Sequence, residues 1–145
     1  MNACIVKIGH DMYSLPLPPR LISQKNNLSP LEISNFPSLP EPLAYLTASV
    51  EGSFVYISGG KNKQHSVNSF YRLDLRYKKE WEKLKDFPGP PRALHTATIQ
   101  ETKDAKKLFL IGGRNQTKGK KSITLSDYLS YDLNRKTWSE EGNLL

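Results

Sequence analysis

The chain has 145 residues, a net charge of +7 and 37% hydrophobic residues, which suits one globular domain. No apolar run approaches the ~18 residues of a membrane span, so we expect no membrane partner. The excess of lysine and arginine is spread over separate turns, without a recognition helix or a nucleic-acid motif, and we expect no nucleic-acid partner.

Few residues are available for metal or cofactor chemistry. Cys4 is the only cysteine, and His10, His65 and His95 lie in unrelated contexts. These patterns exclude a disulfide within the chain and argue against a metal site. The chain has no glycine-rich phosphate loop and no nucleophile elbow, and we therefore expect no cofactor.

The first 27 residues show no clear period, and prolines at positions 16, 18 and 19 interrupt any regular element there. We expect residues 1–27 to form an irregular N-terminal segment. The apolar stretch near the start is interrupted by Lys7 and followed by His10 and Asp11, which is a poor match to a signal peptide. The cellular compartment stays open.

Residues 28–42 look like the end of one repeat unit. The apolar residues at 31–33 resemble a last strand, and the linker at 36–40 matches the linker at 87–91, 51 residues later. We expect a stub of a truncated blade followed by its linker.

Two complete units follow, at residues 43–91 and 92–145, and each contains four strand-like segments rich in β-branched and aromatic residues. Each unit therefore predicts a four-stranded antiparallel meander. The expected strands lie near 47–50, 54–60, 69–74 and 81–84 in the first unit and near 96–99, 108–113, 127–132 and 138–140 in the second.

The same residues recur in the same order in both units. A double glycine recurs after 53 residues, an aspartate after 58 and a tryptophan after 57. Glycine permits a close approach at a strand end, aspartate favours a turn, and tryptophan covers apolar area between units. A period near 50 residues predicts a propeller. We expect an all-β fold, an incomplete β-propeller with two antiparallel blades plus the stub of a third.

The order of double glycine, Leu-Asp or Tyr-Asp, and tryptophan resembles the kelch repeat over residues 43–141. Two linker phrases are more specific: Pro-Leu-Ala-Tyr at 42–45 and Phe-Pro-Gly-Pro-Pro-Arg at 87–92. They resemble the bacterial sialic acid mutarotases, or N-acetylneuraminate epimerases, most closely the cyclically permuted branch. The resemblance implies a six-bladed kelch propeller, typically periplasmic or exported, that interconverts the α and β anomers of N-acetylneuraminic acid.

The chain departs from that family in three ways. It has room for two to three blades and not six, it lacks the usual export signal, and it lacks the later stretch that carries the family's proposed glutamate acid/base. The catalytic residue is therefore unknown.

Three residues are candidates for substrate binding. The resemblance implies a ligand with a carboxylate, which a guanidinium binds through two parallel hydrogen bonds. Arg92 stands just before an expected innermost strand, where propeller ligands commonly sit; alternatively, it bonds carbonyls of a neighbouring blade. His95 follows, as a channel-facing residue or a structural hydrogen-bonding residue. Arg114 follows the second double glycine, as a ligand contact or a solvated loop residue.

Two hypotheses follow. In the first, the chain is a fragment or truncated relative of a sialic acid mutarotase, an isomerase only when the propeller is complete, with further kelch blades or self-association supplying the rest. In the second, it is a kelch-type protein-interaction module without catalytic activity. Exposed apolar blade faces would favour self-association of the isolated chain.

Overall fold

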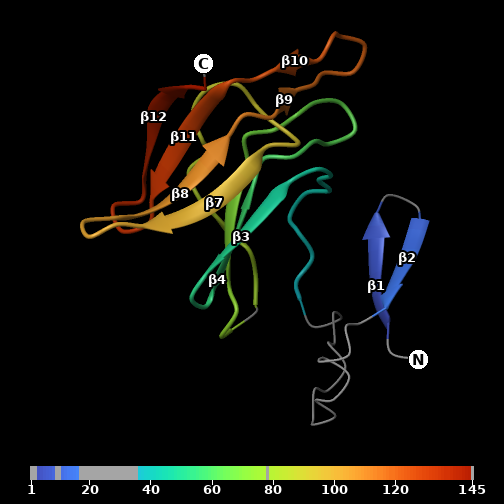
Figure 1. Ribbon diagram of the computed structural model, residues 1–145, viewed down its shortest axis with the longest axis horizontal. Helices are drawn as coiled ribbons and strands as arrows, with labels where there is room; N and C mark the ends of the chain where they lie inside the picture. The colour runs from blue at the N-terminus through green and yellow to red at the C-terminus, as the bar shows by residue number, and fades with distance from the viewer. Residues whose placement is uncertain (1–2, 9–10, 17–35, 78, 145) are drawn as a thin grey trace. The chain divides into compact units, whose positions relative to one another are not determined.

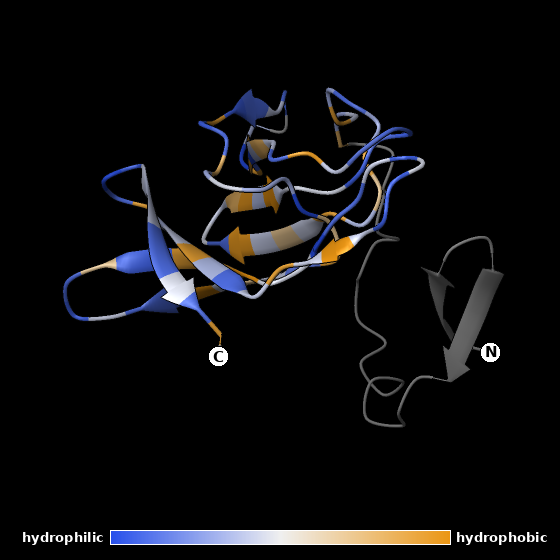
Figure 2. Cartoon of the chain, turned by 90° about the horizontal axis from the view of Figure 1, so that it is seen from above, coloured by the Kyte–Doolittle hydropathy of each residue, from blue (hydrophilic) through white to orange (hydrophobic). Residues whose placement is uncertain are grey.

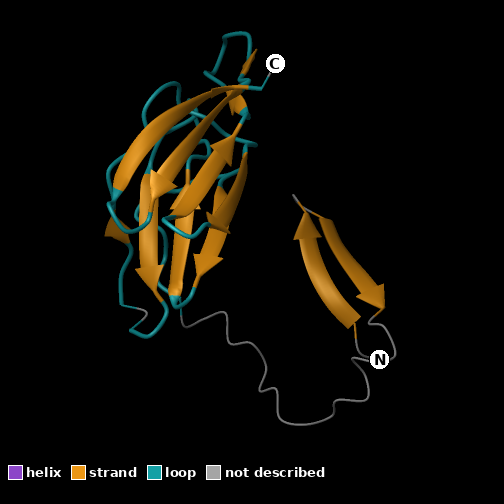
Figure 3. Ribbon diagram, turned by 60° about the vertical axis from the view of Figure 1, so that its left-hand side comes forward, coloured by secondary structure: helices purple, strands orange, loops and turns teal. Residues whose placement is uncertain are grey.

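A computed structural model describes residues 3–8, 11–16, 36–77 and 79–144. The chain divides into two units, Met1–Asn35 and Phe36–Leu145. Every regular element in the described part is a strand (Figure 3). Among those residues there is no helix of the length and apolar character needed to cross a membrane.

The first unit contains a hairpin in which β1 (Ala3–Ile8) pairs antiparallel with β2 (Asp11–Pro16). The expectation of an irregular segment over residues 1–27 differs from this finding. The β-branched residues of β1 favour an extended chain, and the prolines begin only at the last residue of β2. The expected stub strand at 31–33 lies outside the described residues.

The second unit begins with a four-stranded sheet, the first blade, in which strands that are neighbours in sequence pair antiparallel (Figure 1). Its order is β3-β4-β5-β6. The strands are β3 (Thr47–Glu51), β4 (Phe54–Ser58), β5 (Phe70–Asp74) and β6 (Glu82–Lys83).

The second blade repeats this arrangement with the order β7-β8-β11-β12. A short hairpin, β9 (Arg114–Asn115) and β10 (Ile123–Thr124), forms in the stretch that the sequence predicted as a polar loop. Strands β3 and β7 lie beside each other. The strands of the blade are β7 (Thr96–Glu101), β8 (Lys106–Ile111), β11 (Asp127–Asp132) and β12 (Thr137–Asn143).

The hydrophobic core lies between the two blades. Phe70 of β5 packs edge-on against Tyr131 and Trp138 of the second blade, with ring centroids 4.9 and 5.0 Å apart. Phe87, in the linker between the blades, also meets Trp138. Apolar residues gather on the strands while the loops are hydrophilic (Figure 2). Each blade therefore covers its partner's apolar face, as predicted for a repeat architecture.

The double glycines occupy positions that a side chain could not. A Cβ at Gly59 would stand 2.5 Å from the carbonyl oxygen of Arg92, and one at Gly113 would stand 2.8 Å from the Cβ of His95. Both glycines also have positive φ, which residues with a side chain rarely adopt. The predicted reason for these glycines, close approach at a strand end, is confirmed.

The repeated aspartates and tryptophans also have their predicted roles. Asp74 accepts the amide of Arg76, and Asp132 accepts the amides of Asn134 and Arg135. The ring N–H of Trp81 donates to Pro37 O, and that of Trp138 donates to Lys85 O, both at 3.0 Å. Each tryptophan is thus bonded to the linker that precedes its own blade.

Candidate functional site

The two blades have two ends, which we name for their connections. The loop face is the end where β3 and β7 begin and where the segments 59–69 and 112–126 lie. The turn face is the opposite end, with the β3–β4 and β7–β8 turns. The predicted site residues belong to the loop face, because they precede or follow strand ends located there.

Equivalent residues start the innermost strands at the loop face. Tyr45 precedes β3 and Leu94 precedes β7, and both have left-handed backbones, with φ of 57° and 56°. Both side chains are exposed, Tyr45 by 61% and Leu94 by 53%. The amide of Leu94 donates to the carbonyl of Tyr45 at 3.0 Å, so the two starting segments are tied to each other. Two side chains thus project to solvent side by side in chain register.

Arg114 lies at the same end. Its backbone exchanges two hydrogen bonds with Ala93, which places it next to the start of β7. The side chain is exposed and has no ion-pair partner in the described part of the chain. A free guanidinium at this place has the chemistry that a carboxylate ligand requires.

Arg92 is fully buried and already occupied. Its guanidinium donates to both carboxylate oxygens of Asp127, at 3.1 and 2.6 Å, and to the carbonyl of Gly112 at 3.1 Å. Its aliphatic and cationic parts also cover the Phe87 ring. These are the contacts of the structural alternative, an arginine that joins neighbouring blades. A ligand role for Arg92 stays a prediction, and the geometry does not favour it.

His95 is buried beneath the start of β7. Its Nε2 lies 3.0 Å from Ser58 Oγ, whereas its Nδ1 has no partner among the described residues. Burial, and secondly the charge of Arg92, lower the pKa of His95 from 6.5 to about 4. The ring is therefore neutral at pH 7 and fills the space that Gly59 and Gly113 leave open. Its contacts are those of a structural hydrogen-bonding residue.

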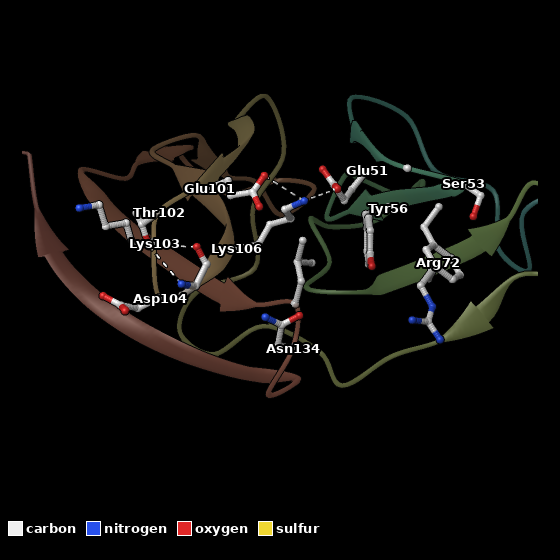
Figure 4. Close-up of a pocket in the computed structure, with 14 residues that line it drawn as sticks. Glu51, Ser53, Tyr56, Arg72, Glu101, Thr102, Lys103, Asp104, Lys106 and Asn134 are labelled. Atoms are coloured by element: carbon white, nitrogen blue, oxygen red, sulfur yellow. Dashed lines mark hydrogen bonds and ion pairs between the residues drawn. The ribbon is translucent and has the colours of Figure 1, made fainter.

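A cleft of about 540 Å³ opens between the blades at the turn face (Figure 4). Lys106 lies between two carboxylates there, 2.6 Å from Glu51 and 3.1 Å from Glu101. On the other side, Arg72 covers the Phe54 ring and pairs with Glu82. The sequence gave no signal for this cleft, because Glu51 and Lys106 meet only when the blades pack together.

The charged groups of the cleft satisfy one another. The hydrogen bond to Glu51, followed by the one to Glu101, raises the pKa of Lys106, so its amine stays protonated. It cannot act as a base near neutral pH. Among the residues that the structure describes, no group of histidine, cysteine or acidic side chains is arranged to hold a metal ion. The cleft is suited to binding and not to proton transfer.

Comparison with known proteins identifies the relatives of this fold. No family model matches the chain. N-acetylneuraminate epimerase 1 of Escherichia coli is 29% identical over 105 residues, covering 72% of this chain and 26% of that protein. N-acetylneuraminate epimerase of Pasteurella multocida is 28% identical, covering 75% and 27%. The chain is a relative of the N-acetylneuraminate epimerases. The predicted resemblance is confirmed.

The structural comparison agrees with the relationship. The solved structure of YjhT matches with a TM-score of 0.58 and 25% identity, covering 74% of this chain and 29% of that one. The all-β architecture, an incomplete propeller with two antiparallel blades, is thereby confirmed. The chain spans about a quarter of the length of the N-acetylneuraminate epimerases that it matches.

Proposed function

We propose that this chain supplies two kelch blades of a sialic acid mutarotase, and that the complete propeller interconverts the α and β anomers of N-acetylneuraminic acid. The observation that carries the proposal is the relationship to N-acetylneuraminate epimerases over 72% to 75% of the chain. The packing of two blades around one core supports it, because such a pair leaves further blade faces to be filled.

Arg114 is the residue that we propose to contact the substrate carboxylate. Its guanidinium is exposed and without an ion-pair partner in the described residues, next to the start of an innermost strand. Arg92 and His95 then have positioning roles, since they hold the second blade against the first. This division keeps all three predicted residues at one face and assigns ligand contact to the accessible one.

The chain alone is proposed to be inactive. Anomer exchange needs a base for the anomeric hydroxyl and an acid for the ring oxygen. At the loop face His95 is buried and holds its proton only at low pH, and Arg92 is paired with Asp127. Neither group is free to transfer a proton to a sugar.

An NMR assay of anomer exchange tests the proposal. A sialidase releases pure α-N-acetylneuraminic acid in the tube, and conversion to the β anomer is followed with and without the chain. We expect the spontaneous rate with the chain alone. Acceleration by the chain would show that the inactivity is wrongly assigned.

A chimera tests the mutarotase assignment itself. Residues 36–145 replace the matching stretch of the Escherichia coli relative, and the chimera is assayed in the same way. We expect exchange above the spontaneous rate, and a lower rate with Arg114→Gln. A chimera that melts cooperatively but exchanges only at the spontaneous rate would contradict the proposal.

A further inference from the structure

The two loops of the loop face pair with each other. The segment 59–69 connects β4 to β5, and the segment 112–126 connects β8 to β11; we call them the paired loops. The amide of Ser66 donates to Gln116 O at 2.7 Å, and the amide of Lys118 donates to Gln64 O at 2.6 Å. The loops follow each other on the same side of the blades (Figure 1). Segments some 50 residues apart thus form one surface.

Ser66 fixes this pairing from within. It is 1% exposed, and its hydroxyl donates to Arg114 O at 3.3 Å while accepting the amide of Gln116 at 3.0 Å. The side chain of Asn62 caps the turn below by accepting the amides of Gln64 and His65. The surface is therefore built before any partner arrives, which limits the entropic cost of binding.

The paired loops carry positive charge without negative charge. Neither loop contains an aspartate or glutamate, and together they contain five lysines and one arginine. None of these cations forms an ion pair with another described residue. They are Lys61, Lys63, Arg114, Lys118, Lys120 and Lys121.

The rest of the charge in the fold behaves differently. At the turn face, Arg72, Arg76 and Lys106 each pair with a carboxylate. The acids closest in the chain to the paired loops are also engaged, since Glu41 accepts the hydroxyls of Ser69 and Tyr71 and Asp127 pairs with Arg92. The unbalanced charge is confined to one face, where it attracts anions.

The composition of the paired loops indicates which anion. They contain no phenylalanine, tyrosine or tryptophan on which a base could stack, and the fold offers no recognition helix in its described part. Ile123 is the large hydrophobic residue exposed on them, which is too little to anchor in lipid. Lysines alternate instead with amides such as Asn62, Gln64 and Gln116, groups that bond to hydroxyls and single carboxylates.

We propose that the paired loops bind an acidic polysaccharide, a polymer of sugars that each carry a carboxylate. Repeated single charges match separate lysine ammonium groups, and the amides bond the sugar hydroxyls. The inference goes beyond anomer exchange and does not depend on it, because it concerns a polymer held outside the starts of the innermost strands.

Isothermal titration calorimetry with the full chain tests this. The probe is polygalacturonate, with dextran of equal length as the neutral control. We expect binding to polygalacturonate that weakens as the salt concentration rises, and no binding to dextran. Equal heats from the two polymers, or no heat from either, would overturn the proposal. Tighter binding of single-stranded DNA or of phosphatidylserine vesicles would overturn it as well.

Charge-matched variants assign the binding to the paired loops. The triple variant Lys118→Gln, Lys120→Gln, Lys121→Gln removes three exposed positive charges, and we expect an affinity loss of about tenfold.

The control removes three exposed lysines elsewhere: Lys79→Gln, Lys85→Gln and Lys103→Gln. We expect a loss of less than about twofold, because only the net charge changes. Circular dichroism verifies that both variants are folded. Equal losses in the two variants would show that the attraction is unspecific and would overturn the site.

Discussion

Arg92 and Asp127 form the pair on which the contact between the blades depends most directly. The guanidinium is fully buried, and both carboxylate oxygens accept from it. Without Asp127 the buried charge would keep only the carbonyl of Gly112 as a partner. Leaving a buried charge unpaired costs more than the pair itself contributes.

Asp127→Asn is therefore expected to lower the free energy of unfolding by about 2–4 kcal/mol. Chemical denaturation followed by circular dichroism measures it. Asp86→Asn is the matched control, since Asp86 pairs with Lys83 while both side chains are about half exposed. A change within about 0.5 kcal/mol is expected there. Equal effects of the two substitutions would contradict the role given to Asp127.

His95 predicts a pH dependence of stability. Its folded pKa of about 4 lies below the ordinary 6.5, so between these values the unfolded chain binds more protons than the folded one. Stability from this group is complete above pH 6.5 and is lost as the pH falls toward 4, by about 3 kcal/mol in total.

Denaturation between about pH 5 and 7 isolates this effect, because the carboxylates with lowered pKa, such as Asp132 and Glu141, begin to protonate only below that window. His95→Gln is expected to flatten the profile in this range. His65→Gln changes an exposed histidine and is expected to keep the slope. A slope that survives in His95→Gln would contradict the assignment.

At the scale of elements, the strands were predictable and their partners were not. The repeated double glycine, aspartate and tryptophan located both four-stranded sheets, because each residue serves a local need at a strand end or turn. The hairpin β1–β2 was missed, since its apolar residues show no repeat and the nearby prolines drew attention. The pairing of Arg92 with Asp127, and of Glu51 with Lys106, depends on contact between blades and leaves no local signal.

The candidate site divides along the same line. The sequence identified Arg92, His95 and Arg114 from their places beside strand ends, and all three lie at the loop face. It could not tell which guanidinium is buried, because the burial of Arg92 comes from Phe87 and from β11. The pairing of the two loops also went unseen, since both were predicted as polar loops.

Ser66 is expected to control the pairing of the loops. Ser66→Ala removes a buried hydroxyl that both donates and accepts, and we expect a loss of about 1–2 kcal/mol in stability with faster hydrogen exchange at Gln116 and Lys118. Ser122→Ala is the control, because the Ser122 hydroxyl is buried without a hydrogen-bond partner in the described residues. Little change is expected there. Exchange at Gln116 that is unaffected by Ser66→Ala would rule out the clamp.

At the scale of the whole molecule, a two-blade unit leaves blade surface uncovered. Val50 on the innermost strand β3 is 61% exposed although valine is typical of a strand interior. We expect the isolated chain to self-associate through this strand, with a sedimentation coefficient that rises with concentration.

Val50→Lys is expected to shift sedimentation toward the monomer. Ile123→Lys is matched to it, because Ile123 is also 61% exposed but lies on the β9–β10 hairpin. No shift is expected from that change. A wild-type chain that sediments as a monomer at every concentration would remove the reason for both expectations.

The tryptophan hydrogen bonds have a consequence for how such a chain can be divided. Trp81 donates to Pro37 and Trp138 donates to Lys85, so the last strand of each blade is fastened to residues that precede its first strand. The module that can be excised or transplanted is therefore offset from the sequence repeat by one linker. A cut at residue 43 would strand the indole of Trp81 without its acceptor, whereas a cut at residue 36 would carry the fastening along with the blade.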